Sequence, residues 1–230
     1  MTAQQHPEGK PFLIIDTSKV QVSHAHRAHV LKYLFDVGEG LTAGEELVCD
    51  EGQYRIKRLK RPIVEMKGKA IETLAAPITS FVYGELAGIC EKLNLPRFVP
   101  VNTEVKLLAC NNGASMKRHV DSGTRRNSQG ERRLTWLYYL HDEPRQFAGG
   151  NLIFHLPSGA IHEVAPTAGR LVVFSSAQPH EVSPVVITSN VARSSRLVLT
   201  GFVMGRRSFG RELSQWVKDR LSAVFSPHKE

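Results

Sequence analysis

The sequence predicts an α+β fold in which helices support a core of short strands arranged as a jelly roll or barrel. From about Thr103 onward the chain consists of short apolar or alternating runs separated by turn residues. Before that point, stretches with helical patterning predominate. Strands at such close intervals favour a double-sheet jelly roll over βαβ units. The 230 residues are enough for one domain with a substantial core.

The N-terminal part is expected to be mainly helical support for the core. Ser23 occupies an N-cap position and Gly38 a stop position, so they bound one helix, while Pro77 is expected to break or kink a second helical stretch. In order, the expected elements are a disordered segment at 1–10, a short strand at 12–16, a helix at 23–37, strand character at 53–66 and a helical stretch at 69–93.

The core is expected over residues 103–204. Turn residues such as Asn112-Gly113 and Gly149-Gly150 separate its runs. The expected strands lie at 103–110, 133–140, 151–155, 160–165, 171–174, 180–187 and 196–204. A helix at 208–225 carries an apolar stripe and closes the chain. We therefore expect a single domain over 11–230, with helical support at 11–102.

Composition points to an ordinary globular protein without a membrane span. Hydrophobic residues make up 41% and charged residues 23% of the chain, and no apolar run approaches the about 20 residues that a bilayer requires. The N-terminus is polar and lacks the apolar centre of a secretory signal. The three cysteines are scattered and form no CxxC motif, which indicates reduced thiols and a cytoplasmic location.

The chain is basic, with a formal net charge of +8 and a pI near 9.6. Lysine and arginine gather at 54–61 and at 125–133. A solvated basic edge strand and a basic loop explain these clusters most simply, because no nucleic-acid-binding motif accompanies them. An enzyme directed at nucleic acid or a basic nucleic-acid-binding protein is the alternative, and its sign would be tight, salt-sensitive binding to DNA or RNA.

A candidate metal site begins at His119-Val120-Asp121, which follows a strand-like run. Residues two apart on a strand point the same way, so both side chains can face the mouth of the core. Two histidines and one carboxylate form the facial triad of non-haem iron(II) oxygenases, which leaves coordination positions open. His180, which begins a later apolar run, is the best candidate for the third ligand.

Arg196 is a candidate for binding an anionic co-substrate. It opens the strand RLVLTGF, where alternation places Arg196, Val198, Thr200 and Phe202 on one face. An arginine on an inward-facing set is costly unless it pairs with an anion. Its guanidinium fork matches a carboxylate, such as the distal one of 2-oxoglutarate.

At these motifs the chain resembles the 2-oxoglutarate/iron(II) dioxygenases, and within them the prolyl 4-hydroxylase-like branch. The likeness spans about residues 103–204. Its motifs are LLAC (107–110), RHVD (118–121), LTWLYYL (134–140), GGNLIF (149–154), PTAGRLVVFSS (166–176), HEVSPV (180–185) and RLVLTGF (196–202).

The resemblance implies a double-stranded β-helix core of jelly-roll or cupin-like type, supported by N-terminal helices and a C-terminal helix. It implies that His119, Asp121 and His180 bind Fe(II), and that Arg196 and Tyr139 bind 2-oxoglutarate. O₂ would be the second co-substrate, with ascorbate as a stimulant. Because Asp121 is retained where halogenating relatives carry a small residue, hydroxylation of an aliphatic C–H is the expected reaction.

The chain departs from the family pattern at three places. A tyrosine usual in the family is replaced by the stretch Cys110–Asn112, so its contact is lost or made by Asn111. The interval between His180 and Arg196 is 16 residues, longer than usual, which leaves Arg193 as a rival for the carboxylate. The basic loop 122–133 could act as a lid.

The expected substrate is a prolyl or other peptidyl residue, an amino acid or an amino-acid-derived small molecule. The preference for peptidyl or amino-acid substrates rests on the family resemblance alone. A jelly-roll scaffold without catalytic activity is the remaining alternative, and the intact ligand set argues against it. The sequence does not name the substrate or the oligomeric state.

Overall fold

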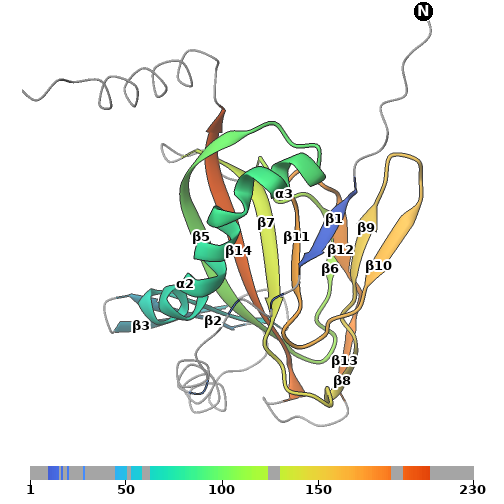
Figure 1. Ribbon diagram of the computed structural model, residues 1–230. Coiled ribbons are helices and arrows are strands. Elements are labelled where there is room, and N and C mark those ends of the chain that lie inside the picture. Colours follow the sequence, from blue (N-terminus) through green and yellow to red (C-terminus); the bar gives the residue numbers. More distant parts are fainter. Residues whose placement is uncertain are drawn as a thin grey trace, which may run out of the picture.

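The computed structural model describes residues 10–15, 17, 20, 28, 45–50, 53–58, 63–123, 130–187 and 194–207. Their strands form an eight-stranded sheet (the major sheet), a four-stranded sheet (the minor sheet) and a two-stranded sheet (Figure 1). The major and minor sheets enclose an apolar interior, and helices cover the outer face of the major sheet (Figure 1). This arrangement confirms the predicted jelly-roll core.

The major sheet has the order β1-β11-β7-β14-β5-β4-β2-β3, and the minor sheet has the order β10-β9-β12-β6. The strands of the major sheet are β1 (Phe12–Ile15), β2 (Glu45–Asp50), β3 (Gln53–Arg58), β4 (Ile63–Lys67), β5 (Phe98–Cys110), β7 (Glu131–Tyr139), β11 (Leu171–Ser175) and β14 (Arg196–Arg207). Those of the minor sheet are β6 (Met116–His119), β9 (Leu152–His155), β10 (Ile161–Val164) and β12 (His180–Val182), and β8 (Phe147–Gly149) pairs with β13 (Val185–Ile187).

Strand alternation divides the apolar residues between two cores. On β7, Trp136 and Tyr138 pack on the helix side of the major sheet, whereas Leu137 and Tyr139 face the interior between the sheets. The other central strands, β11 and β14, divide their residues in the same way. Successive side chains of a strand point to opposite faces, so each central strand stabilises both layers.

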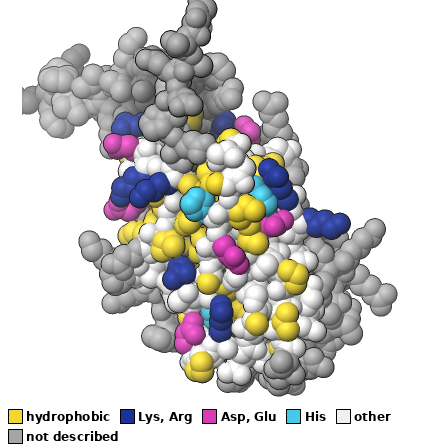
Figure 2. All heavy atoms as spheres, turned by 90° about the vertical axis from the view of Figure 1, so that its right-hand side faces the viewer, with side chains coloured by type: hydrophobic (Ala, Val, Ile, Leu, Met, Phe, Trp, Pro, Cys, Tyr) yellow, Lys and Arg dark blue, Asp and Glu magenta, His cyan; other side chains and the backbone are white. Residues whose placement is uncertain are grey.

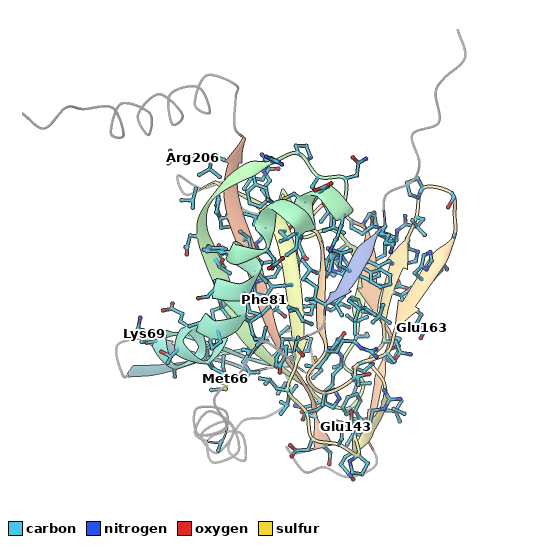
Figure 3. The ribbon with its side chains drawn as sticks, viewed as in Figure 1. Met66, Lys69, Phe81, Glu143, Glu163 and Arg206 are labelled. Atoms are coloured by element: carbon cyan, nitrogen blue, oxygen red, sulfur yellow. The ribbon has the colours of Figure 1, made fainter. Side chains whose placement is uncertain are left out.

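Helices α2 (Lys69–Gly84) and α3 (Leu86–Lys92) pack on the outer face of the major sheet. Figure 3 labels Phe81 on α2 and Met66 on β4, which belong to this outer core. Of the break or kink predicted at Pro77, the break is wrong, because α2 continues through Pro77, and the chain bends by 66° between the two helices. A proline removes one N–H from the helical hydrogen-bond ladder, and burial of the neighbouring Ala75 and Ile78 against the sheet outweighs that loss.

The segment expected as helical support also contributes strands to the major sheet. β1 forms one edge by pairing with β11, and β4 pairs with β5. The basic edge strand predicted at the cluster 54–61 is confirmed, since β3, which covers 53–58, is the last strand of this sheet. The single run predicted at 180–187 is two strands, separated at Ser183-Pro184.

Several sequence predictions fall outside the described residues. They are residues 1–9 of the disordered segment 1–10, most of the helix at 23–37, residues 124–129 of the loop 122–133, the hairpin residues 188–193 and the helix at 208–225. Within the described part, no single helix is long and apolar enough to cross a membrane, although α2 and α3 together reach that length and composition as a bent pair.

The contact between Gly201 and Trp136 tests the packing of the outer core. A Cβ on Gly201 would lie 2.0 Å from Trp136 Cε2, and this indole is fully buried. We expect Gly201→Ala to lower the free energy of unfolding by about 1–3 kcal/mol or more, measured by urea denaturation. The control is Gly88→Ala on α3, where nothing lies within 4 Å of the new Cβ. It should raise stability by about 0.5–1 kcal/mol. Equal stability of the two variants would contradict this packing.

Candidate metal and co-substrate site

His119, Asp121 and His180 meet at one end of the interior. His119 ends β6, His180 begins β12, and the two strands pair so that these residues lie opposite each other. The imidazole centroids are 4.4 Å apart. Each histidine Nε2 lies 3.6 Å from a different oxygen of Asp121, and the ligand atoms of the three residues all lie within 4.8 Å of one another. The structure thus brings His180 to the His119–Asp121 pair, which lies about 60 positions earlier in the sequence.

Backbone carbonyl groups orient both imidazoles. His119 Nδ1 is 2.8 Å from the carbonyl oxygen of Lys117, and His180 Nδ1 is 2.9 Å from that of Gln178. A carbonyl oxygen accepts but does not donate, so in the neutral ring each Nδ1 carries the proton and each Nε2 faces Asp121 with its lone pair. In this tautomer both Nε2 atoms can bind a metal ion.

Asp121 is held by a separate set of contacts. The Thr135 hydroxyl donates to its Oδ2 at 2.8 Å, and Thr135 also contacts the Ser176 hydroxyl at 2.9 Å. The backbone N–H groups of Asp121 and Ser122 both donate to the Ser176 carbonyl at 2.8 Å. Burial by itself would raise the pKa of Asp121. The two neighbouring imidazoles and the Thr135 hydrogen bond outweigh this effect and lower the pKa, so the group remains an anion.

The donor set fits a divalent iron ion. Metal–ligand bonds of about 2.0–2.2 Å can bridge the two 3.6 Å separations between imidazole nitrogens and carboxylate oxygens. Burial is the main cause that lowers the pKa of His180, which keeps this imidazole neutral and able to bind. Two imidazoles and one carboxylate on one side of an ion leave its other positions open for oxygen ligands.

Arg196 lies deeper in the same cavity and is 2% exposed. Its Nε donates to the Gly150 carbonyl at 2.8 Å, and its Nη2 lies 3.5 Å from the Tyr139 hydroxyl. Gly150 has φ of 66°, and a Cβ there would lie 2.6 Å from Arg196 Cδ, so glycine permits this close approach. No carboxylate among the described residues pairs with the guanidinium. A buried cation in this situation favours an anionic ligand.

The remaining predicted co-substrate residues have different surroundings. Tyr139 is fully buried beside Arg196, as a partner in carboxylate binding would be. Asn111 Oδ1 accepts a hydrogen bond from the Ser195 hydroxyl at 2.6 Å and does not line the cavity. Its contact with 2-oxoglutarate remains a prediction. Arg193 lies outside the described residues, so the structure does not compare it with Arg196.

The cavity has a volume of about 690 Å³ and lies between the major and minor sheets. Leu137, Val198 and Phe174 form apolar walls next to the metal ligands. The predicted inward set of β14 is confirmed, since Arg196, Val198, Thr200 and Phe202 all line the cavity. The volume lies within the range of small-molecule sites.

The other described histidines, His141, His155 and His162, do not line the cavity. His155 Nε2 is 3.5 Å from Glu181, and His162 lies exposed on the edge strand β10. His141 lies in the connection between β7 and β8, where it is 2% exposed and packs against Phe147 and Tyr139. Burial is the main cause that lowers its pKa. The apolar contacts come from residues on both sides of a turn, which local sequence does not reveal.

Sequence reasoning missed Thr135, Ser176, Glu65 and Lys106. Thr135 and Ser176 belong to the predicted strand and turn motifs, but nothing in those motifs indicates that they meet at Asp121. Glu65 and Lys106 lie in segments that the sequence marked only as strands. The alternation of β5 could have placed Lys106 on the same face as Leu108, which is the signal that was available.

Side-chain types are mixed on the face of the molecule that carries β9 and β10. Figure 2 shows hydrophobic, basic, acidic and histidine side chains interspersed there. The basic clusters noted in the sequence lie at 54–61 and 125–133, where the structure describes few side chains.

A family model and a relative of similar sequence both match this chain. Residues 105–204 match the model of the 2OG-Fe(II) oxygenase superfamily. An uncharacterized PKHD-type hydroxylase of Synechocystis is 26% identical over 176 residues, which are 73% of this chain and 57% of the relative. The chain thus spans little more than half the length of that relative.

Solved structures share the fold. A prolyl-4-hydroxylase of Pseudomonas putida is 24% identical with a TM-score of 0.55, and the match covers 85% of this chain and 93% of that one. A prolyl hydroxylase of Trichoplax adhaerens, in complex with a hypoxia inducible factor peptide fragment, is 19% identical with a TM-score of 0.53, covering 94% and 88%. The solved structures share the fold, and the match of residues 105–204 confirms the resemblance drawn from the sequence.

The Thr135 hydroxyl provides a test of the metal site that leaves the ligands in place. Thr135→Val keeps the side-chain shape and removes the hydrogen bond to Asp121, so we expect the affinity for Fe(II) to fall about 10–100-fold. Anaerobic titration with Fe(II), or with Co(II) as a spectroscopic substitute, measures the change. Thr73→Val on the exposed side of α2 is the control. Affinity within twofold of wild type for Thr135→Val would contradict the assigned role.

Proposed function

We propose that this chain, whose residues 105–204 belong to the 2OG-Fe(II) oxygenase superfamily, is an Fe(II)- and 2-oxoglutarate-dependent dioxygenase that hydroxylates an aliphatic C–H bond. One observation carries the proposal. The two imidazoles and the carboxylate of the metal site line the same cavity as the buried, anion-seeking Arg196. An iron site alone would not require a second cation, whereas a site for iron and a dicarboxylate co-substrate would.

The proposed reaction consumes one 2-oxoglutarate, one O₂ and one substrate C–H, and it yields succinate, CO₂ and the alcohol. Iron supplies the redox chemistry when bound at His119, Asp121 and His180. Arg196 and Tyr139 hold the distal carboxylate of the co-substrate, which fixes its position relative to the metal ligands. The apolar walls at Leu137, Val198 and Phe174 keep water from the reacting groups.

The substrate is proposed to be a prolyl or other peptidyl residue, an amino acid, or a small molecule derived from one. The cavity size supports a ligand that enters alongside the co-substrate. The Trichoplax adhaerens neighbour was solved with a peptide fragment, and the likeness of fold extends that substrate type to this chain as a proposal.

Uncoupled turnover tests the activity without knowledge of the substrate. Purified protein with Fe(II), ascorbate and O₂ should convert 2-oxoglutarate to succinate, detected by mass spectrometry or NMR. His119→Ala removes one ligand from the metal site, so succinate formation should fall to background. Succinate formation that persists in His119→Ala would exclude this site as its source.

Arg196 and Arg193 can be separated by the same assay. Removing a buried charge partner costs about 2–5 kcal/mol, so Arg196→Leu should raise the KM for 2-oxoglutarate on the order of 30-fold or more. Arg193→Leu should leave that KM within about twofold, as should Arg97→Leu at an exposed position. A larger effect in Arg193→Leu than in Arg196→Leu would reassign the carboxylate to Arg193.

A further inference from the structure

We propose that the substrate presents a carboxylate to Lys106 and Thr200, which form a second anion site in the cavity, separate from Arg196. The inference rests on the proposed function, because it assigns Arg196 to 2-oxoglutarate. It adds the chemical class of the substrate and the residues that select it.

The two anion sites lie at different positions along the same strand. Arg196 and Thr200 both face the cavity from β14 and are four residues apart, which corresponds to about 13 Å along an extended strand. Lys106 of β5 is the register partner of Thr200. The carboxyl carbons of 2-oxoglutarate are joined by four C–C bonds of about 1.5 Å, so they are at most about 6 Å apart. A co-substrate bound at Arg196 therefore leaves Lys106 and Thr200 to another ligand.

Thr200 offers a buried hydroxyl that makes no hydrogen bond to any described residue. The residue is 5% exposed and lines the cavity, and its Oγ1 is fully buried. Thr135, which lines the same cavity, uses its hydroxyl on Asp121 and Ser176. A buried hydroxyl without a partner costs about 1–3 kcal/mol, and an acceptor atom on a bound ligand would remove that cost.

Lys106 can bind a ligand without leaving Glu65, its present partner, unpaired. Its Nζ lies 2.8 Å from Glu65 Oε1, and Lys67 Nζ lies 2.6 Å from the same oxygen. Burial by itself would raise the pKa of Glu65, but the two ammonium groups lower it, so the carboxyl remains ionised. If Lys106 turns to a substrate anion, Lys67 still neutralises Glu65. One positive charge is then available to the ligand.

The charge of the cavity lining favours an anion. Five cationic side chains line it against two carboxylates: Lys106, Lys117, Arg118, Arg132 and Arg196 against Glu65 and Asp121. Divalent iron and the dianionic co-substrate add charges that cancel. The lining therefore keeps an excess of positive charge after both have bound, and an anionic substrate would be attracted to it.

The donor geometry favours a carboxylate over a phosphate. One ammonium and one hydroxyl provide a donor for each of two oxygens. Arg132, the guanidinium beside them, is already committed: its Nε and Nη2 donate to Glu104 Oε2 at 3.2 and 2.6 Å, and it stacks on Phe202 at 3.7 Å from the ring centroid. A phosphate would need that third, multidentate donor.

Matched acid and amide probes test the inference. The probes are free L-amino acids with their carboxamides, and glutamate-containing prolyl tripeptides with their glutamine counterparts. Substrate-stimulated succinate release is measured for wild type, Lys106→Met, Lys106→Arg and Thr200→Val. Lys69→Met is the control, because Lys69 lies exposed at the start of α2 (Figure 3). Thermal-shift binding with Zn(II) in place of iron gives a second measurement without turnover.

We expect an acid probe to stimulate succinate release at a concentration at least about 10-fold lower than its amide. Lys106→Met and Thr200→Val should raise the half-saturating acid concentration about 10-fold or more, and Lys106→Arg should recover part of the loss. In both variants this rise should exceed any rise in the KM for 2-oxoglutarate, whereas Lys69→Met should keep both values within about twofold of wild type. Stimulation by free amino acids or by tripeptides identifies the source of the carboxylate.

Three results would overturn the inference: amides that act as well as acids, no stimulation by any acid while uncoupled release continues, or a Lys106→Met variant whose defect is in 2-oxoglutarate affinity. Failure of the proposed function looks different, since wild type would then release no succinate at all. In that case the thermal-shift measurement with Zn(II) still tests the anion site. The site is supported if acid probes stabilise wild type but not Lys106→Met, and it is refuted if acid probes do not stabilise wild type.

Discussion

The pairing of β6 with β12 is the constraint on which the site depends. It sets His119 opposite His180, although 61 positions separate them in the sequence. The Ser176 carbonyl, in the turn that leads to β12, accepts hydrogen bonds from the N–H groups of Asp121 and Ser122. These backbone contacts join the turn after β6 to the turn before β12. The positions of the three ligands therefore follow from main-chain hydrogen bonds, which side-chain changes elsewhere in the cavity would leave intact.

Because side chains alternate along the central strands, one face of the major sheet packs against the helices and the other lines the cavity. On β14, Leu197, Leu199 and Val203 pack in the outer core with the helices, while the intervening residues face the cavity. Register errors of one residue would exchange these two sets, so the apolar outer core fixes the register of the cavity residues. The helices thus matter to the site although they contribute no residue to it.

Periodicity made much of this molecule predictable from sequence. A period of two located most core strands and the inward face of Arg196, and it placed His119 and Asp121 together. The break at Pro77 failed because packing on the sheet outweighs a local preference. The convergence of Thr135, Ser176 and Lys106 on the cavity depends on cross-strand register, which a single sequence does not encode in any local pattern.

The two cationic sites of the cavity differ in ways that would sort two anions between them. Arg196 is almost fully buried, lies beside the Tyr139 phenol, and has no carboxylate partner among the described residues. Water would therefore screen its charge little, and the guanidinium would fix the orientation of an anion bound to it. Lys106 is 18% exposed in its side chain and shares a carboxylate with Lys67, so its attraction for an anion is weaker and more screened. An anion that must stay through the reaction is best held at the first site, and one that must enter and leave is best held at the second. The difference in binding strength between the two sites requires no conformational change of the backbone, because burial and ion pairing already establish it.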